Sequence, residues 1–217
     1  MKKCVLFDFD GVLNDSVEVK TEAFLAVYRE EASQEQLDKV KAYHLEHGGL
    51  SRKHKFKYFE EEVFGRSIEE DKIFKLMNEF EAEVMKGFAG DTLFLGAKLC
   101  LEEVRNIGLK IFIVSGAPEK EIRQILQRHD LCHFFSGVFD GEESKEFHIR
   151  NIMEQEDISS RECIFVGDSM TDYRASVLCN IDFYAVNANF SPQEKESSRF
   201  ESLEKFRMNL NKLLDIE

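Results

Sequence analysis

Four groups of polar residues directly follow short apolar segments of this 217-residue sequence. The first group is Asp8-Phe9-Asp10-Gly11, in which two carboxylates two positions apart can point to the same side of an extended chain. One carboxylate can attack a phosphorus atom, while the other handles the protons of the leaving group and of the attacking water. Gly11 allows a tight turn beside a bound phosphate. The pair Asp8 and Asp10 therefore predicts phosphoryl transfer with acid/base assistance.

The second and third groups can bind phosphoryl oxygens. In Val114-Ser115-Gly116-Ala117-Pro118 an apolar run leads into a helix start, where free backbone NH groups and a hydroxyl can contact an anion. Lys145, the only lysine in the stretch 121–194, begins the next predicted helix. Its ammonium group can neutralise charge on a phosphoryl group and on the nucleophile. Ser115, Gly116 and Lys145 are therefore the candidate phosphate-binding residues.

The fourth group places Asp168 and Asp172 four positions apart, after an apolar run that ends at Val166. A few carboxylate oxygens are typical of a magnesium site that keeps several waters and takes an oxygen from a phosphate. The five cysteines are scattered without a CxxC pair, which argues against a zinc site and against a disulfide framework. The predicted cofactor is Mg²⁺.

Strand-like and helical patterns alternate along most of the chain. Apolar runs without polar alternation, typical of strands covered on both faces, occur at residues 4–7, 111–114, 138–139, 163–166 and 183–186. The alternation predicts an α/β fold: a Rossmann-like, doubly wound parallel sheet with its ligands at the carboxyl ends of the strands. One further helix is expected to close this core, with four apolar residues on one face: Leu203, Phe206, Leu210 and Leu213.

Residues 16–87 interrupt this alternation, because every periodic signal there is helical. We therefore predict a Rossmann-like catalytic core made of residues 1–15 and 88–217, with an inserted all-helical cap domain at residues 16–87. An insertion directly after the first strand lies over the ligand-binding end of the sheet. The cap is thus expected to act as a lid and to contribute to substrate specificity.

The segment 47–55 is the only glycine-rich, locally basic part of the predicted cap. Arg52 or Lys55 can meet an anionic part of a substrate when the lid closes, and Arg52 is favoured because its planar fork suits carboxylate or phosphate. The alternative is a simple turn with a solvated basic face. His44 and His47 are expected to be packing or solvated residues, since no third metal ligand is evident. The cap core is expected to contain three apolar residues at helical spacing, Phe56, Phe59 and Val63.

Because the four groups occur in this order at strand ends, the chain resembles the haloacid dehalogenase-like (HAD) hydrolases with a helical cap, and is similar to phosphoglycolate phosphatases and β-phosphoglucomutases. The resemblance covers essentially the whole chain. It implies that Asp8 is the nucleophile and a magnesium ligand. It also implies that Asp10 is the general acid/base and binds the metal through its backbone carbonyl.

The resemblance further implies that Ser115 and Lys145 hold the phosphoryl group and that Asp168 ligates magnesium directly. Asp172 would act through a metal-bound water or by orienting Lys145. The sequence departs from the family pattern after the lysine, where Glu146 replaces the usual proline.

The leading functional hypothesis is a Mg²⁺-dependent phosphatase that hydrolyses a small phosphorylated metabolite through an aspartyl-phosphate. The alternatives are a phosphomutase of the β-phosphoglucomutase type and a non-catalytic module that binds phosphorylated metabolites. Halide removal and phosphonate cleavage are disfavoured by Asp10.

The net charge of −13 disfavours nucleic acid and anionic membranes as partners. The N-terminal apolar run is too short for a signal peptide, so we expect a cytoplasmic protein. The sequence leaves the oligomeric state open.

Overall fold

The computed structural model describes residues 1–67, 69–87, 92–188 and 199–214. The described residues form a six-stranded sheet in the order β3-β2-β1-β4-β5-β6, in which every pair of neighbours is parallel. The strands are β1 (Cys4–Phe7), β2 (Lys110–Val114), β3 (Gly137–Phe139), β4 (Cys163–Gly167), β5 (Asp182–Val186) and β6 (Arg199–Phe200).

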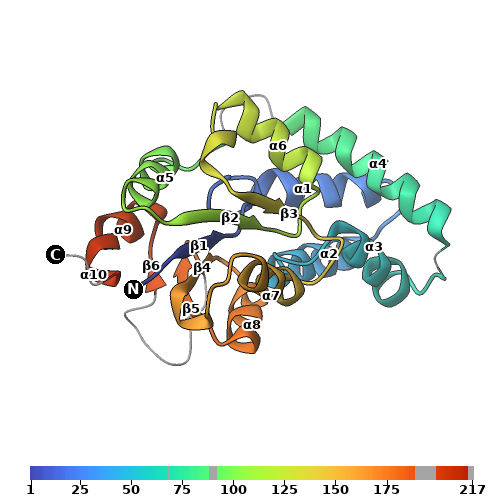
Figure 1. Cartoon of the computed structure of the whole chain (residues 1–217). Helices are drawn as coiled ribbons and strands as arrows, with labels where there is room; N and C mark the ends of the chain where they lie inside the picture. The colour runs from blue at the N-terminus through green and yellow to red at the C-terminus, as the bar shows by residue number, and fades with distance from the viewer. Residues whose placement is uncertain (68, 88–91, 189–198, 215–217) are drawn as a thin grey trace.

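Helices cover both faces of the sheet, with α5 and α6 above it and α7 and α8 below it in Figure 1. In the described part of the chain, no helix is long and apolar enough to cross a membrane. The helices of this core are α5 (Ala97–Asn106), α6 (Glu119–Arg128), α7 (Lys145–Gln155), α8 (Met170–Cys179), α9 (Leu203–Met208) and α10 (Leu210–Leu213), with short 3₁₀ turns η2 (Cys132–Phe134) and η3 (Ser160–Glu162).

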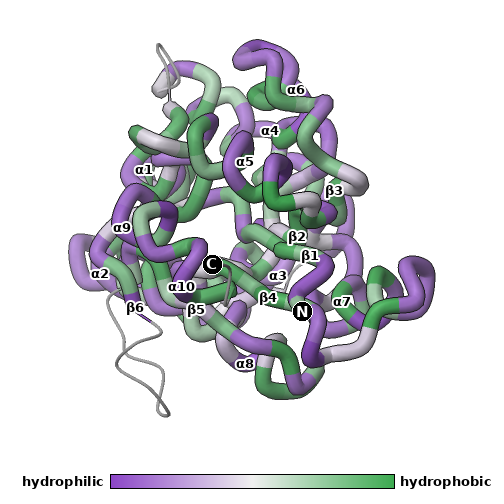
Figure 2. The backbone as a smooth tube through the Cα atoms, turned by 60° about the vertical axis from the view of Figure 1, so that its left-hand side comes forward, coloured by the Kyte–Doolittle hydropathy of each residue, from purple (hydrophilic) through white to green (hydrophobic). Residues whose placement is uncertain are grey.

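Strand β1 shows why the central strands have no polar alternation. Val5 and Phe7 pack into one apolar cluster together with α5, α6 and α9, whereas Cys4 and Leu6 pack into a second cluster together with α7 and α8. Both faces of the strand are thus buried, as expected for a parallel sheet between helices. The hydrophobic centre is visible in Figure 2 as green tube along β1, β2 and β4.

Four α-helices and a π-helix form the described part of the cap between β1 and α5, and the cap lies beyond the carboxyl ends of the strands (Figure 1). Phe24, Phe56, Phe59 and Phe80 belong to its own apolar cluster, separate from the two clusters of the sheet. The expected packing of Phe56 and Phe59 is confirmed, and Val63 is partly buried against them. The cap elements are α1 (Val17–Tyr28), α2 (Gln34–Glu46), α3 (Arg52–Tyr58), the π-helix η1 (Phe59–Val63) and α4 (Glu70–Gly87).

The Rossmann-like fold with an inserted helical cap is confirmed, with two corrections to its details. The sheet gains the two-residue edge strand β6, and the single closing helix is wrong because α9 ends before Asn209 and α10 follows it. The domain limits 1–15, 16–87 and 88–217 stay predictions, and residues 88–91, on which the second limit depends, lie outside the described residues. The cytoplasmic location also stays a prediction.

Candidate active site

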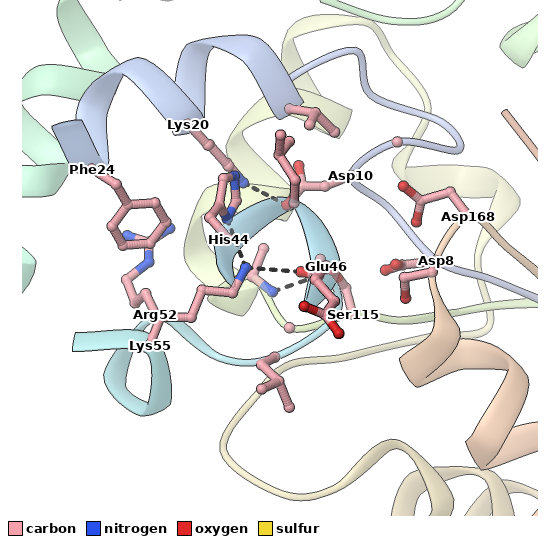
Figure 3. Close-up of a pocket in the computed structure, with 18 of the residues that line it drawn as sticks. Asp8, Asp10, Lys20, Phe24, His44, Glu46, Arg52, Lys55, Ser115 and Asp168 are labelled. Atoms are coloured by element: carbon pink, nitrogen blue, oxygen red, sulfur yellow. Dashed lines mark hydrogen bonds and ion pairs between the residues drawn. The ribbon is translucent and has the colours of Figure 1, made fainter. Parts of the chain in front are cut away.

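A cavity of about 600 Å³ lies between the cap and the carboxyl ends of the strands. Asp8, Asp10, Ser115 and Asp168 line it from the core, and the view in Figure 3 shows Asp8 and Asp168 close to each other. The cap side of the lining comes from α1, the end of α2, α3 and α4, including Lys20, Phe24, His44, Arg52, Lys55 and Phe80.

Asp8 follows β1 directly and is 3% exposed. Lys145 at the start of α7 lies 3.0 Å from its Oδ2 atom, and the backbone NH of Phe9 donates to Oδ1 over 2.7 Å. Burial, followed by the neighbouring charge of Asp172, raises the pKa of Asp8 to about 7, although Lys145 opposes the shift. Burial opposes the charge of Lys145, but Asp172 and Asp8 outweigh it and raise the pKa of that ammonium group. Burial and the nearby acid thus oppose the charge on Asp8, and Lys145 at ion-pair distance is the group that favours its carboxylate form.

Asp8, Asp168 and Asp172 each offer one carboxylate oxygen, and these oxygens lie within 4.8 Å of one another. Burial and the charges of Asp8 and Asp172 raise the pKa of Asp168 well above its usual range. Gly11 has φ +82° and faces the Asp168 carboxylate, which a Cβ atom at position 11 would overlap. Only glycine therefore lets the chain turn so close to this carboxylate.

Asp172 is fully buried, and both of its oxygens have partners. Oδ1 accepts from Lys145 over 2.5 Å, and Oδ2 accepts from the hydroxyl of Ser169 over 2.6 Å and from its backbone NH over 3.0 Å. Ser169 is the N-cap of α8, so the same capping box fixes the helix start and the carboxylate. Of the two roles considered for Asp172, this geometry favours orienting Lys145.

Asp10 lies on the cavity wall with its carboxylate held from the cap side. Lys20 of α1 lies 2.5 Å from Oδ2, and Oδ1 accepts from Ser16 over 2.5 Å and from Asn14 over 3.2 Å. Burial alone would raise the pKa of Asp10, but the ion pair with Lys20 and the hydrogen bonds from Ser16 and Asn14 lower it. Asp10 is therefore held as a carboxylate in this arrangement.

Ser115 and Gly116 follow β2, and a cap loop lies directly against them. Ser115 is 2% exposed, and its hydroxyl accepts from the backbone NH of Ala117 over 3.2 Å. A Cβ atom at Gly116 would lie only 2.6 Å from the carbonyl oxygen of Gly49. A Cβ atom at Gly49 would in turn lie 3.1 Å from Lys145 Nζ. The loop between α2 and α3 thus closes over the candidate phosphate-binding residues.

Arg52 and Lys55 both line the cavity, as expected, but their partners differ. Arg52 donates to Glu121 of α6, and its guanidinium lies 4.9 Å from the ring centroid of Phe80. Lys55 is 3% exposed and contacts His44 Nδ1 at 2.9 Å and the carbonyl of Gly48 at 3.1 Å. Among the described residues, no carboxylate forms an ion pair with Lys55. The sequence-based roles of both residues in substrate recognition stay predictions.

Sequence reasoning missed Lys20, His44 as a partner of Lys55, and Glu121. Lys20 is on the same helical face as the buried Phe24, four residues later. A lysine on the apolar face of a helix could have indicated a buried cation. For Glu121 no such signal exists, because its partners are 101 and 69 positions away along the chain.

The fold and this site agree with the family to which the chain belongs. The model of the haloacid dehalogenase-like hydrolase family matches residues 5–186, so the protein is a member of that family of hydrolases. The match contains all four groups of polar residues described above.

Curated relatives include several proteins named phosphoglycolate phosphatase, of which two serve as examples. That of Vibrio cholerae is 27% identical over 89 residues, and that of Aliivibrio fischeri is 23% identical over 107 residues. These matches cover 39% and 47% of this chain and the same shares of the relatives, so less than half of each relative is matched.

Similar solved structures share the fold. A β-phosphoglucomutase from Clostridium difficile has a TM-score of 0.75 at 16% identity, covering 99% of this chain and 100% of that chain. A hydrolase from Pseudomonas syringae has a TM-score of 0.77 at 17% identity, covering 98% and 99%. At such identities the similarity establishes the fold alone.

Proposed function

We propose that this protein is a Mg²⁺-dependent phosphatase that hydrolyses a small phosphorylated metabolite through an aspartyl-phosphate at Asp8. The observation that carries the proposal is the buried Asp8 carboxylate, which lies 3.0 Å from Lys145 and within an acidic group that includes Asp168. A nucleophile beside a cation and beside further hard oxygen ligands is the arrangement that phosphoryl transfer needs. The family membership and the name of the matched relatives support the same reaction.

In the first step an Asp8 oxygen attacks phosphorus, and the bond from phosphorus to the alcohol oxygen breaks. Asp10 enters this step in its protonated form and gives that proton to the oxygen, so the alcohol leaves neutral. The Asp10 carboxylate paired with Lys20 is the form that accepts a proton in the second step. In the second step water attacks the aspartyl-phosphate, Asp10 takes the proton of the water, and inorganic phosphate leaves with Asp8 restored. Ser115, Gly116 and Lys145 bind the phosphoryl oxygens in both steps.

The donor set fits magnesium. Asp8 and Asp168 would supply carboxylate oxygens and the backbone carbonyl of Asp10 a third, and none of these is a sulfur or nitrogen donor. Among the described residues no hydrogen-bond donor contacts the Asp168 carboxylate, and its raised pKa reflects burial beside other acids. When bound, the ion neutralises the negative charge that these acids and a phosphate bring together. Asp172 is left out of the proposed ligand set, because its carboxylate pairs with Lys145.

The substrate is proposed to carry an anionic group beyond its phosphate. Lys55 is a buried cation on the cavity wall without a carboxylate partner among the described residues, whereas Arg52 and Lys20 contact Glu121. A buried ammonium group without a counter-ion favours a ligand that brings one. A cavity of about 600 Å³ holds a small metabolite.

The test is a screen of phosphorylated metabolites for release of inorganic phosphate, with Mg²⁺ and with a chelator. Asp8→Asn is expected to lower turnover by at least about a thousandfold, because it removes the nucleophile. Asp38→Asn is the matched control, since Asp38 is exposed on α2 and its side chain accepts only from Gln34 within the described part of the chain. Unchanged turnover in Asp8→Asn would refute the covalent mechanism. A phosphorylated isomer in place of free phosphate would favour the phosphomutase alternative.

A further inference from the structure

Two buried cations of the cap meet one carboxylate of the core. Lys20 of α1 lies 2.6 Å from Oε1 of Glu121, and Arg52 of α3 donates to Oε2 of the same residue. Glu121 itself belongs to α6, which packs on the sheet. The side chains of Lys20, Arg52 and Glu121 are 8%, 10% and 17% exposed, so all three are largely removed from water.

Lys20 connects this contact to the catalytic region, because it also lies 2.5 Å from Asp10 (Figure 3). We call these four side chains, Lys20, Arg52, Asp10 and Glu121, the cap–core network. It contains two positive charges from the cap and two negative charges from the core. Charges removed from water are tolerated only when they are paired, so each half of the network requires the other half in place.

The network acts where the cap covers the phosphate-binding residues. The loop that precedes α3 contacts Gly116 and Lys145 through Gly49, and Arg52 is the first residue of α3. A helix held at Arg52 therefore fixes the loop on the site. Without a partner for Arg52 and Lys20, closing the cap would bury two cations with only Asp10 to balance them.

We propose that Glu121 is a positioning residue that holds the cap closed by pairing with Lys20 and Arg52, and that it thereby keeps Lys20 on Asp10. Glu121 is not among the described residues that line the cavity, so it acts through Lys20 and Arg52. Arg52 then serves chiefly to close the cap, and Lys55 is the cap cation left for the substrate. The consequence for catalysis depends on the proposed phosphatase function, whereas the consequence for cap closure does not.

The same contacts define a competing role for Glu121, which the experiments separate from the first. If Arg52 bound the substrate directly, Glu121 would compete with the substrate for its guanidinium group. Removing the charge of Glu121 would then free Arg52 and tighten substrate binding. The two roles predict changes of opposite sign in Glu121→Gln, which keeps the size of the side chain and removes its charge.

The first experiment measures backbone hydrogen–deuterium exchange in the full chain without substrate. Glu121→Gln is expected to speed exchange in residues 47–52 about tenfold, because the loop leaves the core more often when the network is broken. Exchange within the cap cluster of α1 and α4 should stay unchanged. Glu119→Gln is the matched control. Glu119 is on the same helix and carries the same charge, and among the described residues its side chain pairs only with the exposed Arg123.

Unchanged exchange at residues 47–52 in Glu121→Gln would overturn the proposal. So would faster exchange spread through the sheet, because that result indicates general destabilisation. This experiment needs no turnover. The exchange result can therefore be interpreted even if the proposed phosphatase function is wrong.

The second experiment is a double-mutant cycle on the Mg²⁺-loaded enzyme with Glu121→Gln, Arg52→Ala and both together. If the network acts as a unit, each single change lowers kcat/KM about tenfold for every accepted substrate, and the double variant loses little more. A lower KM in Glu121→Gln, dependent on the presence of Arg52, would overturn the proposal in favour of competition. Additive losses would overturn it as well.

Discussion

Burial of the Lys55 ammonium group, without a counter-ion among the described residues, lowers the free energy of unfolding. Lys55 is 3% exposed, and its neighbours His44 and Gly48 bring a ring nitrogen and a carbonyl oxygen, neither of which carries a negative charge. Burial, followed by the positive charge of Lys20, lowers the pKa of Lys55 from 10.5 to about 7. We predict that Lys55→Met stabilises the protein at low pH while it removes the proposed anion contact.

The magnitude follows from the linkage between protonation and folding. A pKa that falls from 10.5 to about 7 on folding costs at most about 5 kcal/mol when both states are protonated. Methionine leaves the acceptors of His44 and Gly48 without a donor, which costs about 1–3 kcal/mol. The expected net gain is therefore about 2–4 kcal/mol near pH 6.

The sign of the pH dependence is fixed by the direction of the shift. Between about pH 7 and pH 10.5 the unfolded chain binds the Lys55 proton and the folded chain does not, so wild-type stability rises with pH relative to Lys55→Met. The difference in free energy of unfolding between Lys55→Met and wild type should therefore fall by about 3 kcal/mol from about pH 6 to about pH 9. This corresponds to a change of roughly 6–12 °C in the difference between their Tm values.

Thermal unfolding of both proteins at the two pH values measures this change. Lys53→Met is the matched control, because Lys53 lies two positions earlier on α3 and pairs with Glu70 at the surface. Its effect should stay within about 0.5 kcal/mol at either pH. A difference between Lys55→Met and wild type that is the same at both pH values would refute the reasoning, as would destabilisation near pH 6.

Two further predictions concern the residues around the nucleophile. Gly116→Ala should lower kcat/KM at least about tenfold, because its Cβ atom would lie 2.6 Å from the Gly49 carbonyl; Gly48→Ala, whose nearest neighbour is 3.5 Å away, should be nearly neutral. Equal kinetics of the two alanine variants would contradict this. Asp172→Asn should lower kcat about a hundredfold with a smaller change in KM, because Lys145 loses the carboxylate that orients it. A change confined to KM, measured by steady-state phosphate release, would assign Asp172 a different role.

Much of the α/β core was predictable because buried parallel strands leave a strong local signal. Residues 4–7 and 163–166 are apolar on both faces, and both became strands at the centre of the sheet. The closing helix was wrong for a local reason. Asn209 caps α9, and its side chain donates to the carbonyl of Lys205 over 2.8 Å, a contact that competes with continuation of the helix.

The site divides in the same way between local and distant signals. Asp8, Asp10 and Asp168 could be proposed because each follows a strand, and parallel strands bring their carboxyl ends to one edge of the sheet. The partner of Asp10 on the cap could not be proposed, since sequence spacing does not report how an inserted domain lies against the core. Glu121 is a further case, as an acid on an amphipathic helix is ordinarily a solvated residue.

Arg52 and Lys55 show why the partners of a cation matter more than its type. Arg52 was the favoured substrate residue because its fork suits carboxylate or phosphate, and in the structure that fork contacts a carboxylate of the protein itself. Lys55 was the weaker candidate because lysine lacks this planar fork. Among the described residues, however, Lys55 is the one of the two cations that has no carboxylate partner. Two buried cations three positions apart on α3 can thus divide two tasks, one closing the cap and one meeting the ligand. The distinction depends on Glu121, so the sign of the change in KM on Glu121→Gln decides between this division and direct binding by Arg52.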